Sequence, residues 1–352
     1  MKNFYKYFRA IFFFVFVMFS CELDNSSLYT DDELTSGFWS SYEMPSDWKF
    51  RDGAGLIEFK GRLLMFGGWT YGEPYNGGKL VNEVWESFDG IKWKQLPNAP
   101  WSPRHGMGFT IHEEKLFILG GDFINDIWST VDGLVWVCEN KDLPFSGRYT
   151  PNLVSIKGNL VVFGGYNCFS GLCAASESCI CLGDDDIWIS KDGKDWKKSL
   201  SPPWNSRGLI HNSLVFKNEI YLMGGGIKQS LLNIPISETK IEFSDIWKSK
   251  DGVNWEKVTD NWEIQNRTHF SVLSAFGVIW VSDGSLGIQS NVSNDLYFSR
   301  DAKKFTQINV PLDMPKRHAS SFAVFKNNLI ILGGPPTDFP RGKVYVYSLN
   351  LD

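Results

Sequence analysis

The sequence predicts an all-β fold built from repeated units of short strands. The chain of 352 residues contains 27 Phe, 15 Trp, 12 Tyr and 33 Gly. Aromatic side chains pack well on pleated surfaces and Gly supplies turn conformations, so this composition favours strands joined by tight turns over helices. An apolar run that ends in a Gly pair also recurs along the chain, and repetition at a regular interval is typical of repeat architectures.

The apolar run marks the second strand of each unit. We expect its Gly pair to end that strand, at a place where a Cβ would obstruct the bend or a close backbone approach. The copies are RLLMFGG (62–68), KLFILGG (115–121), NLVVFGG (159–165), EIYLMGG (219–225), NLIILGG (328–334) and a degenerate VIWVSDG (278–284).

A triplet of an acidic, an aliphatic and an aromatic residue marks the third strand. We expect its aromatic side chain to pack between neighbouring sheets. The triplets begin at Glu83, Asp126, Asp186, Asp245 and Asp295, and the last unit has Lys343-Val344-Tyr345 instead. Four of them continue through Asp-Gly to a further aromatic residue, as in FDGIKW (88–93). Asp-Gly favours a type I′ turn, so this string predicts a tight hairpin to a fourth strand.

An arginine precedes the first strand of every unit. The intervals between successive arginines run from 44 residues (Arg104 to Arg148) to 60 residues (Arg207 to Arg267). The six positions are Arg51, Arg104, Arg148, Arg207, Arg267 and Arg317. Together with the Gly pair and the two aromatic positions, this period resembles the kelch repeat, and the resemblance covers residues 39–349. It implies a six-bladed β-propeller over residues 37–352.

The two ends of the chain complement each other. Trp39 lies 12 residues before Arg51, the spacing that separates a fourth-strand aromatic from the next arginine, whereas the last unit has no fourth strand. We therefore expect residues 37–43 to pair with residues 343–349 and to close the ring. Closure would remove unpaired sheet edges.

The first 36 residues are expected to lie outside the fold. Basic residues precede an apolar run from Ala10 to Phe19, as in a signal peptide over residues 1–20. Ser20-Cys21 resembles the lipobox of bacterial lipoproteins, which implies lipidation of Cys21; cleavage of an ordinary signal peptide nearby is the alternative. The polar residues that follow predict a flexible tether over residues 21–36. The chain would then be exported and anchored to a bacterial membrane, facing the periplasm or the cell surface.

Two groups of residues are candidates for ligand binding at the mouth of the central channel. The first is the six arginines together with four of the five histidines, because guanidinium and imidazole groups attract carboxylates. The alternative is that the arginines brace loops against backbone carbonyls and third-strand acids. The second group is the aromatic residues in the long loops after the Gly pairs, which suit sugars or peptides or else pack the loops. These candidates are His105, His211, His269, His318, Trp69, Tyr71 and Tyr166.

The cysteines predict a cross-linked loop. Four of the six fall in one long loop of the third unit, and export exposes them to an oxidising compartment, so two disulfides are expected with open connectivity. These are Cys168, Cys173, Cys179 and Cys181. A Cys₄ metal site is the alternative. Cys138 is left over and is expected to be buried.

The leading functional prediction is a membrane-anchored binding module with a protein or glycan ligand on its loop-rich face. The alternative is a carbohydrate-active enzyme. The bacterial sialic acid mutarotases are six-bladed kelch proteins that act on an acidic sugar, although no catalytic acid or base can be assigned here by motif. The formal charge of -5 and the absence of a basic run in residues 22–352 argue against nucleic-acid binding. No cofactor or metal is predicted, and a monomer is expected.

Overall fold

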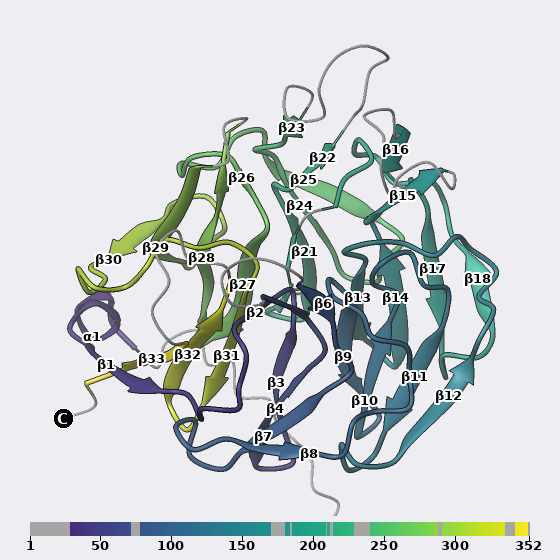
Figure 1. The fold of residues 1–352 in the computed structure, drawn as a ribbon. Helices are drawn as coiled ribbons and strands as arrows, with labels where there is room; N and C mark the ends of the chain where they lie inside the picture. Colours follow the sequence, from purple (N-terminus) through teal and green to yellow (C-terminus); the bar gives the residue numbers. More distant parts are fainter. Residues whose placement is uncertain are drawn as a thin grey trace, which may run out of the picture.

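The chain forms an all-β structure in which antiparallel sheets are arranged consistently with a β-propeller (Figure 1). The computed structural model describes residues 29–71, 78–169, 180–183, 185–208, 210–211, 214–228, 240–287, 291–334 and 342–350. Within these residues, six sheets contain four or more strands. No helix in the described ranges has the length and apolar character needed to cross a bilayer.

Each sheet corresponds to one predicted repeat. The first sheet contains β3 (Gly55–Phe59), β4 (Arg62–Phe66), β7 (Val84–Ser87) and β8 (Lys94–Leu96). The second contains β9 (Gly108–His112), β10 (Lys115–Leu119), β11 (Ile127–Thr130) and β12 (Trp136–Asn140). The third contains β13 (Asn152–Ile156), β14 (Asn159–Phe163), β17 (Ile187–Ser190) and β18 (Trp196–Lys198). The fourth contains β20 (Leu214–Phe216), β21 (Glu219–Met223), β24 (Ile246–Ser249) and β25 (Trp255–Thr259).

The fifth sheet is larger than the others. Its main strands are β27 (Phe270–Ala275), β28 (Val278–Leu286), β29 (Asn291–Ser299) and β30 (Thr306–Ile308). The short β26 (Arg267–Thr268) pairs with β28, and β19 (Ile210–His211) runs parallel to β27. The loops after the Gly pairs form three further ribbons: β2 (Arg51–Asp52) with β5 (Trp69–Thr70) and β6 (Lys79–Leu80), β15 (Tyr166–Phe169) with β16 (Ile180–Gly183), and β22 (Gly226–Lys228) with β23 (Lys240–Glu242).

The sixth sheet joins the two ends of the chain. It contains β31 (Ser320–Phe325), β32 (Asn328–Gly333), β33 (Lys343–Ser348) and β1 (Phe38–Glu43). β1 pairs antiparallel with β33 from Phe38 opposite Ser348 to Glu43 opposite Lys343. The predicted pairing of residues 37–43 with residues 343–349 is therefore confirmed.

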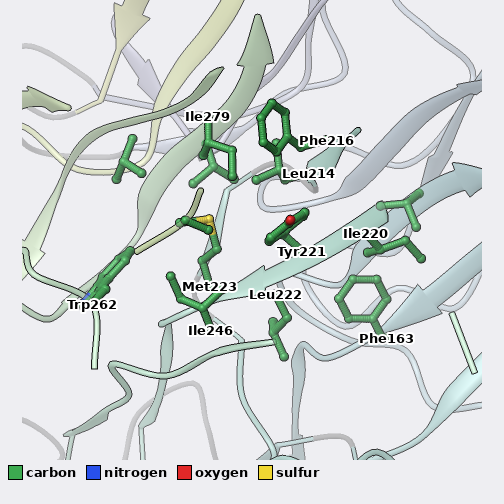
Figure 2. Packing of buried hydrophobic residues seen from close by; sticks show 14 of the residues in the cluster. Phe163, Leu214, Phe216, Ile220, Tyr221, Leu222, Met223, Ile246, Trp262 and Ile279 are labelled. Carbon is green, nitrogen blue, oxygen red and sulfur yellow. The ribbon is translucent and has the colours of Figure 1, made fainter. Parts of the chain in front are cut away.

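Apolar side chains fill the spaces between neighbouring sheets. Figure 2 shows one such cluster, in which Phe163 of the third sheet, Leu222 of the fourth and Ile279 of the fifth belong to one buried core. A second core joins Leu332 of the sixth sheet to Met65 of the first. The first strand of each sheet also contacts the first strand of the next, and β31 contacts β3.

Backbone hydrogen bonds link successive sheets at the ends of the second strands. The second Gly of a pair donates its N–H to the carbonyl of the arginine in the next sheet, as from Gly68 to Arg104 at 2.8 Å and from Gly334 to Arg51 at 2.9 Å. Gly68 has a φ of 107°, and a Cβ there would lie 3.0 Å from the Asp52 carbonyl oxygen. A residue with a side chain would thus be strained and crowded at this junction.

The N-terminal segment is more ordered than the sequence predicted. Residues 21–28, including Cys21, lie outside the described residues, but α1 (Asp31–Thr35) packs against the fifth and sixth sheets (Figure 1). Leu34 is fully buried, and its carbonyl accepts a 2.8 Å hydrogen bond from the Tyr347 hydroxyl. Thr30 and Glu33 form a capping box that stabilises the first turn. A flexible tether over residues 21–36 is therefore wrong for residues 29–36.

The Asp-Gly hairpins also differ from the predicted type I′ turn. Gly90 has a φ of 77°, but Asp89 is not among the residues with positive φ. Its Oδ1 instead accepts the backbone N–H groups of Ile91 and Lys92 at 2.8 and 2.7 Å. An aspartate side chain that accepts local N–H groups stabilises a longer loop, so the hairpin spans residues 88–93 rather than two residues.

Candidate functional site

The six repeated arginines lie in the interior and not at an open channel mouth. Each is at most 1% exposed. Arg104 shows the pattern: its Nη1 donates to the Gly120 carbonyl at 3.1 Å, and its guanidinium makes a paired contact with Asp126 at 2.5 and 3.0 Å. Trp128 Nε1 donates to the same carboxylate at 2.9 Å. The arginine, the Gly pair and the acidic triplet are thus parts of one hydrogen-bonded unit.

The same unit recurs in the first five sheets with small variations. Each guanidinium pairs with the acid of the third strand, and each donates to the carbonyl of the residue at the first Gly-pair position. The ion pairs are Arg51–Glu83, Arg104–Asp126, Arg148–Asp186, Arg207–Asp245 and Arg267–Asp295. The guanidinium groups of the six arginines are desolvated and hydrogen-bonded to the protein, so they are not free to meet a ligand. This corrects the expectation from the sequence for Arg51, Arg104, Arg148, Arg207, Arg267 and Arg317.

Arg317 of the sixth sheet has no third-strand acid as a partner. Lys343 stands where the other sheets have an acid, and Arg317 Nη1 donates to the Gly333 carbonyl at 3.1 Å. An acid lies nearby in the fifth sheet, where Asp283 replaces the first Gly of the degenerate pair and interacts electrostatically with Arg317. Asp283 is fully buried, and its Oδ2 accepts a hydrogen bond from the Ser320 hydroxyl.

Burial raises the pKa of Asp283 to about 8, although the Ser320 hydrogen bond and the charge of Arg317 oppose the rise. The folded protein therefore holds this proton between about pH 4 and pH 8, where the unfolded chain releases it. We expect the free energy of unfolding to fall as the pH rises through this range. Chemical denaturation of wild type and Asp283→Asn at pH 5 and pH 8 measures the effect, since the variant lacks this contribution. Equal pH dependence in the two proteins would refute the assignment.

The residues that follow the arginines meet at one end of the sheets. The N–H of Gly53 donates to the Ala319 carbonyl at 2.9 Å, Gly106 donates to Gly53 at 2.8 Å, and Thr150 donates to Gly106 at 2.8 Å. Ala319 in turn donates to the His269 carbonyl at 2.6 Å. All five residues lie two positions after an arginine and have a φ between 50° and 61°. The loops of the fifth, sixth, first, second and third sheets are therefore bonded in succession.

The side chains carried by these loops form a group that we call the polar-aromatic cluster. Its members are Asp52, Trp69, Tyr71, His105, Asp122, Phe123, Tyr149, Tyr166 and His318. Four of them, Asp52, His105, Tyr149 and His318, directly follow their arginine in the sequence. The predicted candidates Trp69, Tyr71, His105, Tyr166 and His318 thus come together, whereas the sequence prediction missed Asp52, Asp122, Phe123 and Tyr149.

His105 lies at the centre of a hydrogen-bonded chain. Its Nδ1 is 2.8 Å from the Asp122 carboxylate, and its Nε2 is 2.9 Å from the Tyr149 hydroxyl. Burial raises the pKa of Tyr149 well above its usual value, so this hydroxyl keeps its proton. Protein groups therefore occupy both ring nitrogens of His105 and hold the ring in place.

Asp52 is the second carboxylate of the cluster. Its Oδ2 accepts a 2.7 Å hydrogen bond from Tyr71 and lies 4.0 Å from His318 Nε2. Its Oδ1 is buried and has no hydrogen-bond partner among the described residues. Burial raises the pKa of Asp52, while the charge of His105 and the Tyr71 hydrogen bond lower it. Tyr71 also keeps its proton, because burial and the charge of Asp52 raise its pKa.

Aromatic rings surround these polar groups. The ring of His105 lies 6.0 Å from that of Trp69 and 4.9 Å from that of Tyr149. Phe123 is 40% exposed and packs against Tyr149 and Tyr166 at 6.1 and 5.9 Å between ring centroids. The cluster therefore offers both partly exposed aromatic faces and hydrogen-bonding groups, the combination that ligand sites generally use.

The other two predicted histidines are not members of the polar-aromatic cluster. The ring of His269 lies 5.5 Å from that of His318, at the edge of the cluster. His211 lies in β19, and only its backbone is described. Within the described ranges, no group of three or more His, Cys, Asp and Glu side chains is arranged to hold a metal ion.

The cysteine predictions have different outcomes. Cys173 and Cys179 lie outside the described residues, and Cys168 stands opposite Cys181 in the register of β15 and β16. Two disulfides in this loop remain a prediction. Cys138 is exposed on β12, so its predicted burial is wrong. Cys138 lies on the edge strand of its sheet, where the neighbouring Val137 is exposed as well.

The chain was also compared with known proteins. A scan against protein-family models and a search of curated proteins find no match.

Proposed function

We propose that this chain is a six-bladed β-propeller of kelch-type repeats with a closed ring. Support comes from the contacts between successive first strands, which return from β31 to β3, and from the hydrogen bond between Gly334 and Arg51. The pairing of β1 with β33 supplies a fourth strand to the last sheet from the other end of the chain. Closure of this kind protects both the sheet edges and the apolar surfaces between the sheets.

We infer that the protein is an exported binding module that a lipid on Cys21 holds at a bacterial membrane. The basic and apolar residues before Ser20-Cys21 support export and lipidation. Metabolic labelling with a fatty acid should mark the wild-type protein and not a Cys21→Ser variant. Equal labelling of both proteins would contradict lipidation at this residue.

The polar-aromatic cluster is the proposed ligand site, and a glycan is the proposed ligand. One observation supports this proposal: the partly exposed rings of Trp69 and Phe123 belong to the same cluster as three polar side chains. The polar side chains are Asp52, His105 and Asp122. Aromatic faces pack against the apolar faces of sugar rings, and carboxylate and imidazole groups exchange hydrogen bonds with hydroxyls. A protein ligand is the alternative, and a peptide array distinguishes it.

The test replaces one aromatic side chain of the cluster. In the chain without residues 1–28, Trp69→Ala should weaken glycan binding by at least about tenfold, because buried aromatic contacts dominate interface energies. Glycan-array screening followed by calorimetry measures this effect. Phe88→Ala is the control, since Phe88 is 59% exposed on the hairpin at the other end of the first sheet. Failure of every glycan to bind would remove the proposed function.

A sugar isomerase is a second candidate function. The observation that favours it is the presence of carboxylate and imidazole groups within reach of one another, with Asp122 at 2.8 Å from His105 and Asp52 at 4.0 Å from His318. Acid and base catalysis requires such partners in place. Exchange between sugar anomers, measured by NMR, should then be faster with wild type than with His105→Ala. An unchanged exchange rate with every sugar tested would exclude this activity.

A further inference from the structure

We propose that the polar-aromatic cluster selects a glycan that carries a free, positively charged amino group. This inference rests on the proposed function of the same site and names its ligand class. It departs from the acidic sugar that the arginines and histidines predicted from the sequence. Three features of the cluster favour such a ligand: its charge, an unsatisfied acceptor on Asp52, and the aromatic faces beside that acceptor.

The charges of the cluster favour a cation. Asp52 and Asp122 contribute two carboxylates, with side chains 11% and 20% exposed. The guanidinium groups that lie behind them are buried, and in the first five sheets they are paired with third-strand acids. No described lysine or arginine forms an ion pair with Asp52 or Asp122. A ligand carboxylate would therefore meet like charges, whereas an ammonium group would meet opposite ones.

The imidazole of His105 does not make the net charge of the cluster positive. His105 Nδ1 lies 2.8 Å from the Asp122 carboxylate and Nε2 lies 2.9 Å from the Tyr149 hydroxyl, so protein groups occupy both ring nitrogens. Even a protonated His105 is matched by the Asp122 carboxylate in contact with it, and the pair then has no net positive charge. The pair therefore offers no excess positive charge to a ligand carboxylate.

Asp52 provides a specific acceptor for an ammonium N–H. Residue Asp52 is 8% exposed, and its Oδ2 accepts from Tyr71 at 2.7 Å. Its Oδ1 is buried without a hydrogen-bond partner in the described part of the chain. Such an acceptor is unfavourable until a donor reaches it, and a charged donor to a carboxylate makes a stronger hydrogen bond than a sugar hydroxyl. The carboxylate therefore discriminates between an amine and its neutral acetylated form.

The loops hold this acceptor close to the aromatic part of the cluster. The Gly106 N–H donates to the Gly53 carbonyl at 2.8 Å, so the loops that carry Asp52 and His105 are in direct contact. The ring of Trp69 lies 6.0 Å from that of His105. Aromatic faces attract cations through their quadrupoles, and they also pack against the C–H face of a pyranose ring. An amino sugar satisfies both requirements at once.

The experiment compares two ligands that differ mainly in charge. Calorimetry at pH 7 on the chain without residues 1–28 uses glucosamine oligosaccharides and their N-acetylated counterparts of the same length. We expect the glucosamine form to bind at least about tenfold more tightly, as is typical for a desolvated charge pair. Asp52→Asn, which keeps an acceptor for Tyr71, should reduce this preference to near unity with little effect on the N-acetylated form.

Two further variants make the result specific. Glu58→Gln removes an exposed carboxylate of the first sheet outside the cluster and should leave the preference unchanged. Asp122→Asn should also reduce the preference, and it serves as the second test if Asp52→Asn does not fold. Equal or tighter binding of N-acetylated or galacturonate oligosaccharides would overturn the amino-sugar inference while the glycan-binding function stands. An unchanged preference in the folded Asp52→Asn and Asp122→Asn variants would do the same. If no oligosaccharide binds, both proposals fail.

Discussion

Arg104→Ala is expected to lower the free energy of unfolding by about 3–5 kcal/mol, the usual cost of removing one partner of a buried ion pair. The variant leaves Asp126 without its two guanidinium contacts, and it leaves the Gly120 carbonyl without the donor at 3.1 Å. It also removes the cation that lies 5.6 Å from the centroid of the Trp101 ring. Chemical denaturation measured by tryptophan fluorescence gives the difference.

A matched control separates this effect from the loss of any basic side chain. The side chain of Lys94 is 78% exposed and lies 3.9 Å from Glu86, so Lys94→Ala should change the free energy of unfolding by less than about 0.5 kcal/mol. A loss below about 1 kcal/mol for Arg104→Ala would show that the arginine is not a structural brace.

Removal of residues 1–43 is expected to prevent the protein from remaining a stable soluble monomer. The shortened chain lacks α1 and β1, so β33 becomes a sheet edge along the six register pairs from Phe38–Ser348 to Glu43–Lys343. Tyr347, now 1% exposed, loses its contact with the Trp39 ring at 4.9 Å. Exposed edges and apolar surface promote aggregation. Size-exclusion chromatography and thermal unfolding measure the outcome.

The control for this truncation is a chain that begins at residue 29. It keeps α1 and β1 and should unfold at the same temperature as the chain from residue 22. Addition of a peptide of residues 29–43 to the shorter chain should restore stability, because the peptide can pair with β33 as an added strand. An unchanged unfolding temperature without β1 would contradict its role in completing the sixth sheet.

The repeat could be recognised from the sequence because its features are local. A Gly pair after an apolar run, and an acid two positions before an aromatic, depend on neighbouring residues and each recur in five of the six units. The pairing of residues 37–43 with 343–349 followed from counting those units. The role of the arginines could not be decided from local sequence features, because Arg104 and Asp126 are 22 residues apart and only the folded sheet brings them into contact.

The candidate site was only partly predictable for the same reason. Trp69 and Tyr71 stand in a recognisable loop, whereas Asp52 and Tyr149 are single residues after two different arginines. When the repeats are aligned on the arginines, the residue directly after the arginine is polar or aromatic in the first three sheets. These residues are Asp52, His105 and Tyr149. The capping box at Thr30 and Glu33 could likewise be predicted from the sequence. The burial of Leu34 could not, because the segment around it contains few apolar residues.

The docking of α1 bears on how far the protein can reach from a bilayer. If Cys21 carries the lipid, the segment before Tyr29 has eight residues, from 21 to 28, and a fully stretched segment of that length spans roughly 26–29 Å. The folded domain would then lie no farther than about that distance from the lipid headgroups, with the α1 side held toward them. Ligands on long, freely extended polymers could approach the cluster, but a receptor on an opposing cell could not be contacted without close apposition of the two surfaces.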